Sequence, residues 1–512
     1  QGGVCIIMNG HRVATNGDIR LEATPGQWQP VPKQLDRKLG DNSITATLCY
    51  PDSSRHLTGF NPMIYPDLHL IYTVNVESKG KNIEVTVDLD RPIPQEFIGK
   101  VGFNLEFFPG SLFGKPWIMD GQSGIFPQQP NSPLMTTQPN YLHTGNYHDG
   151  KKSLADMDKL IGKGYSPIVA DDIISEPYAK GTKFTSRPDD PYNKVTIESL
   201  SGDLQLFDGR MNHNNGWFVL RSNIKPGVTK GAVKWIITPN VVADWMYQPV
   251  IQTSQIGYHP TQDKEAVIEM DIRDNRKETA QIIRIDADGE KVVKNVTPAN
   301  WGKFLRYNYL KVDFTDVKEP GLYKIKYDTS VSPIFRIDND VYARGVWQPV
   351  LEYFLPVQMC HMRVNEKYRV WHDCCHMDDA QMAPAHNHID GYDQKEGLSK
   401  FKPGEVVPGV NIGGWHDAGD FDLRIESQAG ESYILALAYE AFHPNLDVTS
   451  IDQINRVTEI HQPDGKNDLL QQVENGALTV VNGYLALGRL YRGIICNNLR
   501  QYVLLGDAAA MT

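Results

Sequence analysis

The chain has 512 residues, of which 40% are hydrophobic and 22% charged, and its formal net charge at pH 7 is −11. A chain of this length is expected to fold as roughly two to four domains. This negative net charge argues against nucleic acid as the main partner and favours a neutral or weakly charged substrate. The sequence has no run of about 18 apolar residues that would span a membrane.

Residues 1–245 are predicted to be rich in β-strands. Apolar and polar residues alternate along 71–76 and 83–89, on either side of a turn at Ser78-Lys79-Gly80, which predicts a β-hairpin. Residues 121–150 are rich in Pro, Gln and Asn and are expected to form a long surface loop. We therefore expect an N-terminal β-sandwich-like accessory domain, in which no cluster of reactive side chains indicates a function.

Residues 249–340 are predicted to form a second, smaller β-domain. Strand patterns run through 266–270, 282–285 and 322–327, and Asp288-Gly289 is the dipeptide that type I′ hairpin turns prefer. Several short strands within so few residues are typical of a small sandwich.

After Asp340 the pattern changes to helix. Apolar residues recur at three- and four-residue spacing along 341–356, 427–442 and 467–490. In the last of these helices the expected buried side is marked by Leu469, Leu470, Val473, Leu478 and Val481. The long loops between the helices, notably 381–415, are expected to carry the functional site.

The stretch Gly413-Gly414-Trp415-His416-Asp417-Ala418-Gly419-Asp420 is the strongest candidate for chemistry. Three glycines within 413–419 predict a bent loop. Asp417 and Asp420 form a carboxylate pair beside an aromatic residue, and inverting glycoside hydrolysis needs a carboxylate base that activates a water. An Asx-rich turn that caps the next helix would explain the composition equally well.

The cysteines do not suggest a disulfide framework. Cys360, Cys374 and Cys375 cluster with three histidines, His361, His372 and His376. Such clustering in a large chain favours a metal site or buried thiols over disulfide bonds.

The motif GGWHDAGD at 413–420 resembles the base-bearing motif of glycoside hydrolase family 9, the inverting endoglucanase (cellulase) family. Further stretches are similar to the branch of that family in which an immunoglobulin-like (Ig-like) module precedes the catalytic domain: 255–260 with 313–314 and 320–323, 358–360 with 372–380, and 468–470. The resemblance covers residues from about 250 to 512, whereas residues 1–245 resemble no family that we can name.

The resemblance implies a multidomain chain. Residues 1–245 would form the β-sandwich-like accessory domain, 249–340 the Ig-like β-sandwich, and 341–512 the N-terminal part of an all-α (α/α)6 barrel, a six-hairpin ring of helices with a sugar cleft at one end.

The resemblance also implies catalytic roles. Asp420 matches the general base, and Asp417 matches the carboxylate that helps to hold the attacking water. The general acid, a Glu, is expected beyond Thr512. Trp415 is expected either to stack on a sugar or to pack inside the protein, and His372 either to line the cleft or to support the site from behind.

A structural Zn²⁺ site is implied at Cys360, Cys375, His376 and His416, because relatives with the Ig-like module carry zinc at matching positions. Two thiolates and two imidazoles complete a closed tetrahedral shell, and His416 adjoins Asp417, so the metal would anchor the catalytic loop. Cys374 competes with Cys375 as a ligand, although the Cys-His adjacency favours Cys375. Spacing alone favours buried thiols and a core histidine. Ca²⁺ occurs in relatives but has no ligand pattern here and stays unplaced.

The expected function is that of an inverting endo-β-1,4-glucanase that hydrolyses cellulose, mixed-linkage glucan or xyloglucan, with a β-glucan polysaccharide or oligosaccharide as its partner. A polymer must be cut outside the cytoplasm, so we expect a secreted, periplasmic or cell-surface enzyme. The alternatives are an exo-acting β-glucosidase or glucosaminidase of the same family and a non-catalytic carbohydrate-binding protein. The paired Asp417 and Asp420 argue against the last.

Overall fold

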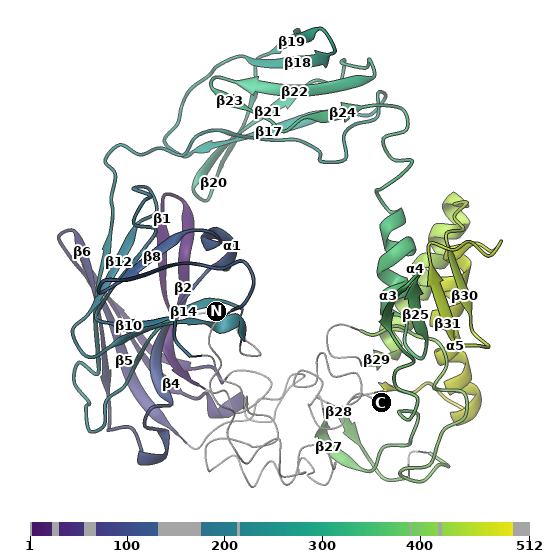
Figure 1. Ribbon diagram of the computed structural model, residues 1–512, viewed down its shortest axis with the longest axis horizontal. Coiled ribbons are helices and arrows are strands. Elements are labelled where there is room, and N and C mark those ends of the chain that lie inside the picture. Colours follow the sequence, from purple (N-terminus) through teal and green to yellow (C-terminus); the bar gives the residue numbers. More distant parts are fainter. Residues whose placement is uncertain are drawn as a thin grey trace. The chain divides into compact units, whose positions relative to one another are not determined.

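The computed structural model describes residues 3–22, 30–55, 68–131, 176–211, 216–389, 392–397, 399–417 and 422–494 (Figure 1). Residues 242–354 form one compact unit together with Asn9–His11. The other unit consists of two stretches of the chain. The first stretch lies before residue 242, and the second begins at residue 355.

The first stretch is a β-sandwich of two antiparallel sheets. The smaller sheet has the strand order β1 (Val4–Met8), β2 (His11–Leu21), β7 (Val101–Phe107), β14 (Phe218–Asn223), β13 (Leu204–Asp208) and β10 (Ala179–Gly181). The larger sheet has the order β3 (Lys33–Leu39), β4 (Ser43–Tyr50), β5 (Leu70–Lys79), β6 (Asn82–Leu89), β15 (Val233–Pro239), β12 (Val195–Ser199), β11 (Lys183–Ser186), β8 (Pro116–Met119) and β9 (Gln122–Ile125). Single helical turns lie at Ser53–Arg55, Gln95–Phe97, α1 (Pro109–Leu112) and Gly209–Met211.

Alternating apolar residues from both sheets form the core of this sandwich. Phe103 of β7 packs edge-on against Trp235 of β15, with ring centroids 5.1 Å apart, and both side chains are buried. The hairpin predicted from the sequence is β5 paired with β6, in a register that places Val74 opposite Val87. The prediction of a β-rich N-terminal region is therefore confirmed.

The second compact unit is a smaller sandwich. One sheet has the order β16 (Val250–Gln252), β17 (Glu265–Asp271), β21 (Tyr307–Asp313) and β20 (Ala299–Phe304). The other contains β19 (Gly289–Val296), β18 (Ala280–Asp286), β22 (Gly321–Tyr327) and β23 (Ser330–Val331), with β24 (Phe335–Ile337) also paired to β22. Its core holds Tyr258, Phe314 and Phe335, whose ring centroids lie 5.1 to 5.5 Å apart.

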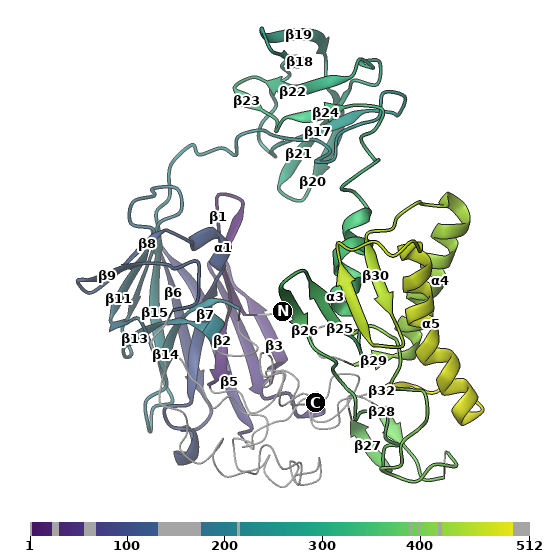
Figure 2. The same cartoon turned by 45° about the vertical axis from the view of Figure 1, so that its right-hand side comes forward.

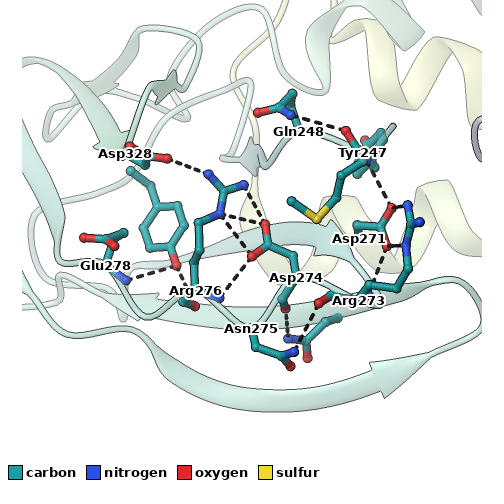
Figure 3. Close-up of polar contacts among 12 residues, drawn as sticks. Tyr247, Gln248, Asp271, Arg273, Asp274, Asn275, Arg276, Glu278 and Asp328 are labelled. Atoms are coloured by element: carbon teal, nitrogen blue, oxygen red, sulfur yellow. Dashed lines mark hydrogen bonds and ion pairs between the residues drawn. The ribbon is translucent and has the colours of Figure 1, made fainter. Parts of the chain in front are cut away.

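Ion pairs fasten the segment that leads into this sandwich (Figure 3). The Asp271 carboxylate, at the end of β17, accepts a hydrogen bond from the Tyr247 backbone N–H at 3.1 Å and one from the Arg273 guanidinium at 2.8 Å. These bonds, with that of Arg273 foremost, lower the pKa of Asp271. Arg273 also donates a hydrogen bond to the Trp245 backbone oxygen at 2.6 Å. A separate bridge, from Arg276 to Asp274 and Asp328 at 2.6 and 2.5 Å, joins the turns after β17 and β22. The contacts of Asp271 and Arg273 are the ones that hold the segment before the first strand to this sandwich.

The stretch after the small sandwich mixes helices with short strands (Figure 2). A π-helical turn, Val350–Phe354, runs into α3 (Leu355–Gln358). The long helices are α4 (Ile425–Phe442) and α5 (Asp468–Leu487), which pack against each other. A sheet of β26 (Arg369–His372), β25 (Arg363–Glu366), β31 (Val457–Ile460) and β30 (Thr449–Asp452) accompanies them, with β25 and β31 parallel. The remaining strands are β27 (His386–Ile389), β28 (Tyr392–Gln394), β29 (Leu423–Arg424) and β32 (Gly493–Ile494).

The helices predicted at 427–442 and 467–490 are α4 and α5, but the helix predicted over 341–356 is wrong in its first half. Residues 341–347 form turns, in which Gly345 has φ +76°. The short sheet was not predicted. Among the described residues, α4 and α5 are the only long helices, so the (α/α)6 barrel stays a prediction.

The buried side of α5 also differs from the prediction. Leu469 is buried, but Leu470 and Val481 are 43% and 52% exposed. Three polar residues, Gln472, Asn475 and Thr479, are fully buried instead. Hydrophobic spacing failed here because this face of α5 makes hydrogen bonds to a neighbouring loop.

No helix within the described ranges is both long enough and apolar enough to cross a membrane.

Candidate active site and metal centre

The loop of residues 411–417 lies against α5 through two glycines in the left-handed region. Gly413 has φ +74° and Gly414 has φ +86°. A Cβ on Gly413 would lie 2.3 Å from the backbone oxygen of Asn475, and one on Gly414 would lie 2.7 Å from Leu423 Cδ2. Only glycine combines this backbone conformation with such close approach, which is why the loop begins with Gly413-Gly414.

Four side chains that are separated in the sequence converge beside this loop. Cys360 Sγ lies 3.0 Å from His376 Nδ1 and 3.6 Å from Cys375 Sγ, and Cys375 Sγ lies 3.3 Å from His416 Nε2. All four donor atoms lie within 4.8 Å of one another. The structure therefore brings together the four residues that the sequence analysis assigned to zinc.

The spacing of the donor atoms suits a metal ion. Zinc bonds of about 2.0–2.3 Å in a tetrahedron give donor–donor edges of about 3.3–3.8 Å. The 3.6 Å distance between the two sulfur atoms and the 3.3 Å distance from Cys375 to His416 lie in this range. The 3.0 Å distance from Cys360 to His376 is slightly shorter. None of the described cysteines forms a disulfide, so both thiols are free to bind a metal.

Burial and mutual contact set the protonation of these groups. Burial raises the pKa of Cys360 well above its ordinary value. Cys375 has its pKa lowered, first by the hydrogen bond from Cys360 and then by contacts with His372 and His416. Burial lowers the pKa of His376 and favours its neutral form. A thiolate and a neutral imidazole are the forms that bind a metal.

A histidine–carboxylate pair, His361 and Asp379, supports the cluster. Buried His361 has its Nε2 atom 3.2 Å from Asp379 Oδ1 and its Nδ1 atom 3.0 Å from the Gly413 oxygen. The opposite Asp379 oxygen lies 3.6 Å from His376 Nδ1. Burial lowers the pKa of His361, but the hydrogen bond and charge of Asp379, together with the bond to the Gly413 oxygen and the charge of Cys375, outweigh burial and the pKa is raised. The sequence analysis noted His361 without a role, and only its adjacency to Cys360 pointed to one.

His372 lies behind the cluster. Its ring centroid is 5.9 Å from that of His416, and its nitrogens lie 2.9 Å from the Asp373 oxygen and 3.1 Å from the Val357 oxygen. These contacts agree with a supporting role. Its expected position on a sugar cleft stays a prediction.

Asp417 is the exposed carboxylate of the loop. Its Oδ1 atom accepts a hydrogen bond from Ser427 Oγ at 3.1 Å, and Oδ2 lies 3.3 Å from Arg424 Nε. Its backbone N–H donates to the Asp422 oxygen at 2.8 Å. Asp417 is thus held at the start of α4, whereas Asp420, the predicted general base, lies outside the described residues.

Trp415 is 1% exposed. Its indole Nε1–H donates to Gln472 Oε1 at 2.8 Å, and its ring lies where a Cβ on Gly476 would approach it to 2.3 Å. A side chain enclosed in this way offers no free face to a sugar. Of the two roles expected for Trp415, burial supports packing inside the protein and not stacking on a sugar.

Comparison with known proteins bears on the second sandwich. Residues 246–332 match the family described as the cellulase N-terminal Ig-like domain. The chain carries an Ig-like module of the cellulase type. The predicted resemblance to the branch of glycoside hydrolase family 9 with this module is confirmed.

The match to a curated relative is longer than the Ig-like module. The chain is 22% identical to Endoglucanase D of Acetivibrio thermocellus over 238 residues, which cover 46% of this chain and 34% of the relative. The chain therefore spans about a third of the length of the curated relative that it matches.

Solved structures of family 9 proteins are also similar. The family 9 endoglucanase J30 is 22% identical, covers 44% of this chain and 38% of its own, and has a TM-score of 0.33. Its Zn-binding triple mutant is 23% identical with the same coverage and a TM-score of 0.32. Bacteroides ovatus GH9 is 19% identical, covers 48% and 41%, and has a TM-score of 0.34.

Proposed function

We propose that this chain belongs to an inverting glycoside hydrolase that cleaves β-1,4-glucan chains internally, with Asp420 as the general base and Asp417 as its partner. The observation that carries the proposal is the position of Asp417, which Arg424 and Ser427 hold one residue after His416. A carboxylate held in this way on a glycine loop is suited to orient a water.

In the proposed reaction Asp420 removes a proton from a water, which attacks the anomeric carbon, while Asp417 accepts a hydrogen bond from the same water. A carboxylic acid on the other side of the bond, about 6.5–9.5 Å from the base, would protonate the leaving oxygen. Inversion follows because the water attacks from the face opposite the departing sugar.

Zn²⁺ is the metal that we propose for Cys360, Cys375, His376 and His416. When bound, it would link the segment after α3 to the loop before α4 and would have no chemical role, because four protein ligands leave no coordination position for water or substrate. The chain's own residues then hold Asp417: the Arg424 and Ser427 side chains on one side and the His416 backbone on the other.

The surface of α4 supports the proposal of an (α/α)6 barrel. Tyr433, Ile434 and Phe442 are 65%, 66% and 80% exposed, although α4 also buries Ile425. A helix with apolar residues on several sides is typical of a protein interior. Helices that contact neighbours on both sides, as in a ring of helical hairpins, would bury these residues.

The substrate class suggests a secreted, periplasmic or cell-surface protein, since a glucan polymer has to be degraded outside the cytoplasm. An exo-acting glycosidase of the same family is the alternative for the enzyme. Product sizes from a long soluble glucan separate the two: internal cleavage gives a range of oligosaccharides, and exo-action gives one small product.

The test compares reducing-sugar release from soluble β-glucans by the full-length protein and by its Asp420→Ala variant. Loss of a general base should lower kcat roughly 100- to 10,000-fold. Asp288→Ala, in a turn of the Ig-like module, is the control and should retain full activity. An inactive wild-type protein on all β-glucans, or equal activity of Asp420→Ala, would contradict the proposal.

A further inference from the structure

We propose that three buried amide side chains, Gln428, Gln472 and Asn475, are positioning residues that hold the loop of residues 413–417 in place for the hydrolysis proposed above. The inference deepens that proposed function, and it rests on contacts of α4 and α5 with the two loop residues that precede His416 and Asp417.

Gln428 holds the backbone of Trp415 from α4. Its Oε1 atom accepts a hydrogen bond from the Trp415 N–H at 2.8 Å, and its Nε2 atom donates to the Trp415 oxygen at 3.0 Å. One amide thus satisfies both polar backbone groups of a single residue, as a neighbouring β-strand would. Gln428 and Trp415 are both buried, so these backbone groups bond to the amide and not to bulk water.

Asn475 holds the preceding residue from α5. Its Nδ2 atom donates to the Gly414 oxygen at 3.0 Å, and its backbone oxygen accepts from the Gly414 N–H at 2.9 Å. Its Oδ1 atom accepts a hydrogen bond from Gln453 Nε2 at 3.0 Å, which fixes the orientation of the amide. Gly413 is needed because the loop backbone lies this close to α5, where a Cβ would lie 2.3 Å from the Asn475 oxygen.

Gln472 completes the set by accepting the indole N–H of Trp415 at 2.8 Å. It is fully buried and lies one helical turn before Gly476, against which the Trp415 ring packs. The backbone of Trp415 is therefore fixed from α4, and its side chain from α5.

Burial of three amides at these positions needs an explanation, because apolar residues are the usual occupants of a helix–helix contact. A buried amide is unfavourable unless its hydrogen bonds are made, and here they go to consecutive loop residues. The next residues are His416, in the metal cluster, and Asp417. The amides therefore fix the backbone from which both side chains project, and a shift of about 1 Å at such a site can lower the rate on the order of 100-fold.

The test replaces Gln428 and Gln472 by Leu in the full-length protein. Gln471→Leu is the matched control, because Gln471 is also buried on α5 but bonds to Asp464 at 2.8 Å and makes no bond to the loop. Two readouts are used: hydrogen exchange of the amides in residues 413–417, and kcat and KM for a soluble β-glucan.

We expect Gln428→Leu and Gln472→Leu to speed exchange in residues 413–417 at least tenfold while exchange along α4 and α5 is unchanged, and to lower kcat with little change in KM. Gln471→Leu should do neither. In a Trp415→Phe background, which removes the indole donor, Gln472→Leu should add no further effect.

Equal acceleration of exchange along the whole segment in all three variants would overturn the proposal, since it would reveal general destabilisation. Unchanged loop exchange in Gln428→Leu would overturn it as well. The exchange experiment needs no catalysis, so an inactive wild-type protein would contradict the proposed hydrolase and still leave the loop contacts decided by exchange.

Discussion

At the scale of single residues, Asp468 shows how burial changes a titration. The Asp468 carboxyl is fully buried at the first residue of α5. It accepts backbone hydrogen bonds from Val448 at 2.9 Å and Thr449 at 3.3 Å. Burial nevertheless raises the pKa of Asp468 to about 6, and Asp447 and Asp464 act in the same direction. The folded protein therefore favours the protonated acid.

The stability that this group contributes should depend on pH. Because the folded pKa lies above the unfolded one, the contribution is complete below the unfolded pKa near 4 and is lost as pH rises through about 6. The difference in unfolding free energy between wild type and Asp468→Asn should change between pH 4 and pH 7 by on the order of 3 kcal/mol. The wild type should lose stability relative to the variant as the pH rises. Urea unfolding at both pH values measures it.

Asp452→Asn is the control for this titration. Its carboxylate accepts hydrogen bonds from Asn455, which lower the pKa of Asp452. Its contribution is lost only below pH 4, so its difference from wild type should stay constant between pH 4 and pH 7. A constant difference for Asp468→Asn as well would show that folding does not raise the pKa of Asp468 above its unfolded value.

At the scale of elements, α4 and α5 differ from ordinary amphipathic helices in what they bury. Their contact contains amides, small residues and one large indole, and the apolar residues expected inside are partly exposed. Gly476 is the point of closest approach, since a Cβ there would lie 2.2 Å from Ser432 Oγ and 2.3 Å from the Trp415 ring.

Gly476→Ala should therefore destabilise the protein, because the new methyl group would push apart α4, α5 and the indole. Overpacking of this kind costs about 1–3 kcal/mol. Gly430→Ala on α4 is the matched change: a Cβ at Gly430 meets no atom within 4 Å, and Ala is preferred to Gly in a helix by up to about 1 kcal/mol. Thermal unfolding of both variants checks the prediction: Gly476→Ala should lower Tm, and Gly430→Ala should not. Equal shifts of Tm in the two variants would show that the prediction is wrong.

At the scale of the whole molecule, the metal cluster joins parts of the chain that lie far apart in the sequence. Cys360 follows α3, Cys375 and His376 follow β26, and His416 precedes α4. A bound ion would stabilise the folded state, in which these donors meet, over the unfolded state.

We expect the full-length protein, purified without chelators, to contain about one Zn²⁺ per chain. Removal of the metal by a chelator should lower Tm, and Cys360→Ser and His416→Ala should lose the metal. Cys49→Ser, outside the cluster, should keep it. Elemental analysis together with thermal unfolding measures these effects, and a zinc content near zero in untreated wild type would refute the metal site.

Features that depend on neighbouring residues were predictable from the amino-acid sequence alone. Period-two alternation predicted the β5–β6 hairpin and the strands of the Ig-like module, and helical spacing predicted α4 and α5. The glycines before Trp415 predicted a bent loop, because positive φ is a local property of the backbone. The motifs from Gln255 onward were sufficient to predict the cellulase-type module that the family comparison confirms.

Features that depend on contacts between distant segments became known only from the folded arrangement. Spacing alone favoured buried thiols over a cluster of Cys360, Cys375, His376 and His416, and the structure brings their donor atoms within 4.8 Å. From the sequence, Trp415 could stack on a sugar or pack inside the protein. In the structure it is buried against α5, so its ring is not available to a sugar. The buried side of α5 was predicted wrongly because hydrophobic spacing assumes an apolar neighbour, whereas this helix contacts a loop whose exposed peptide groups need hydrogen-bonding partners.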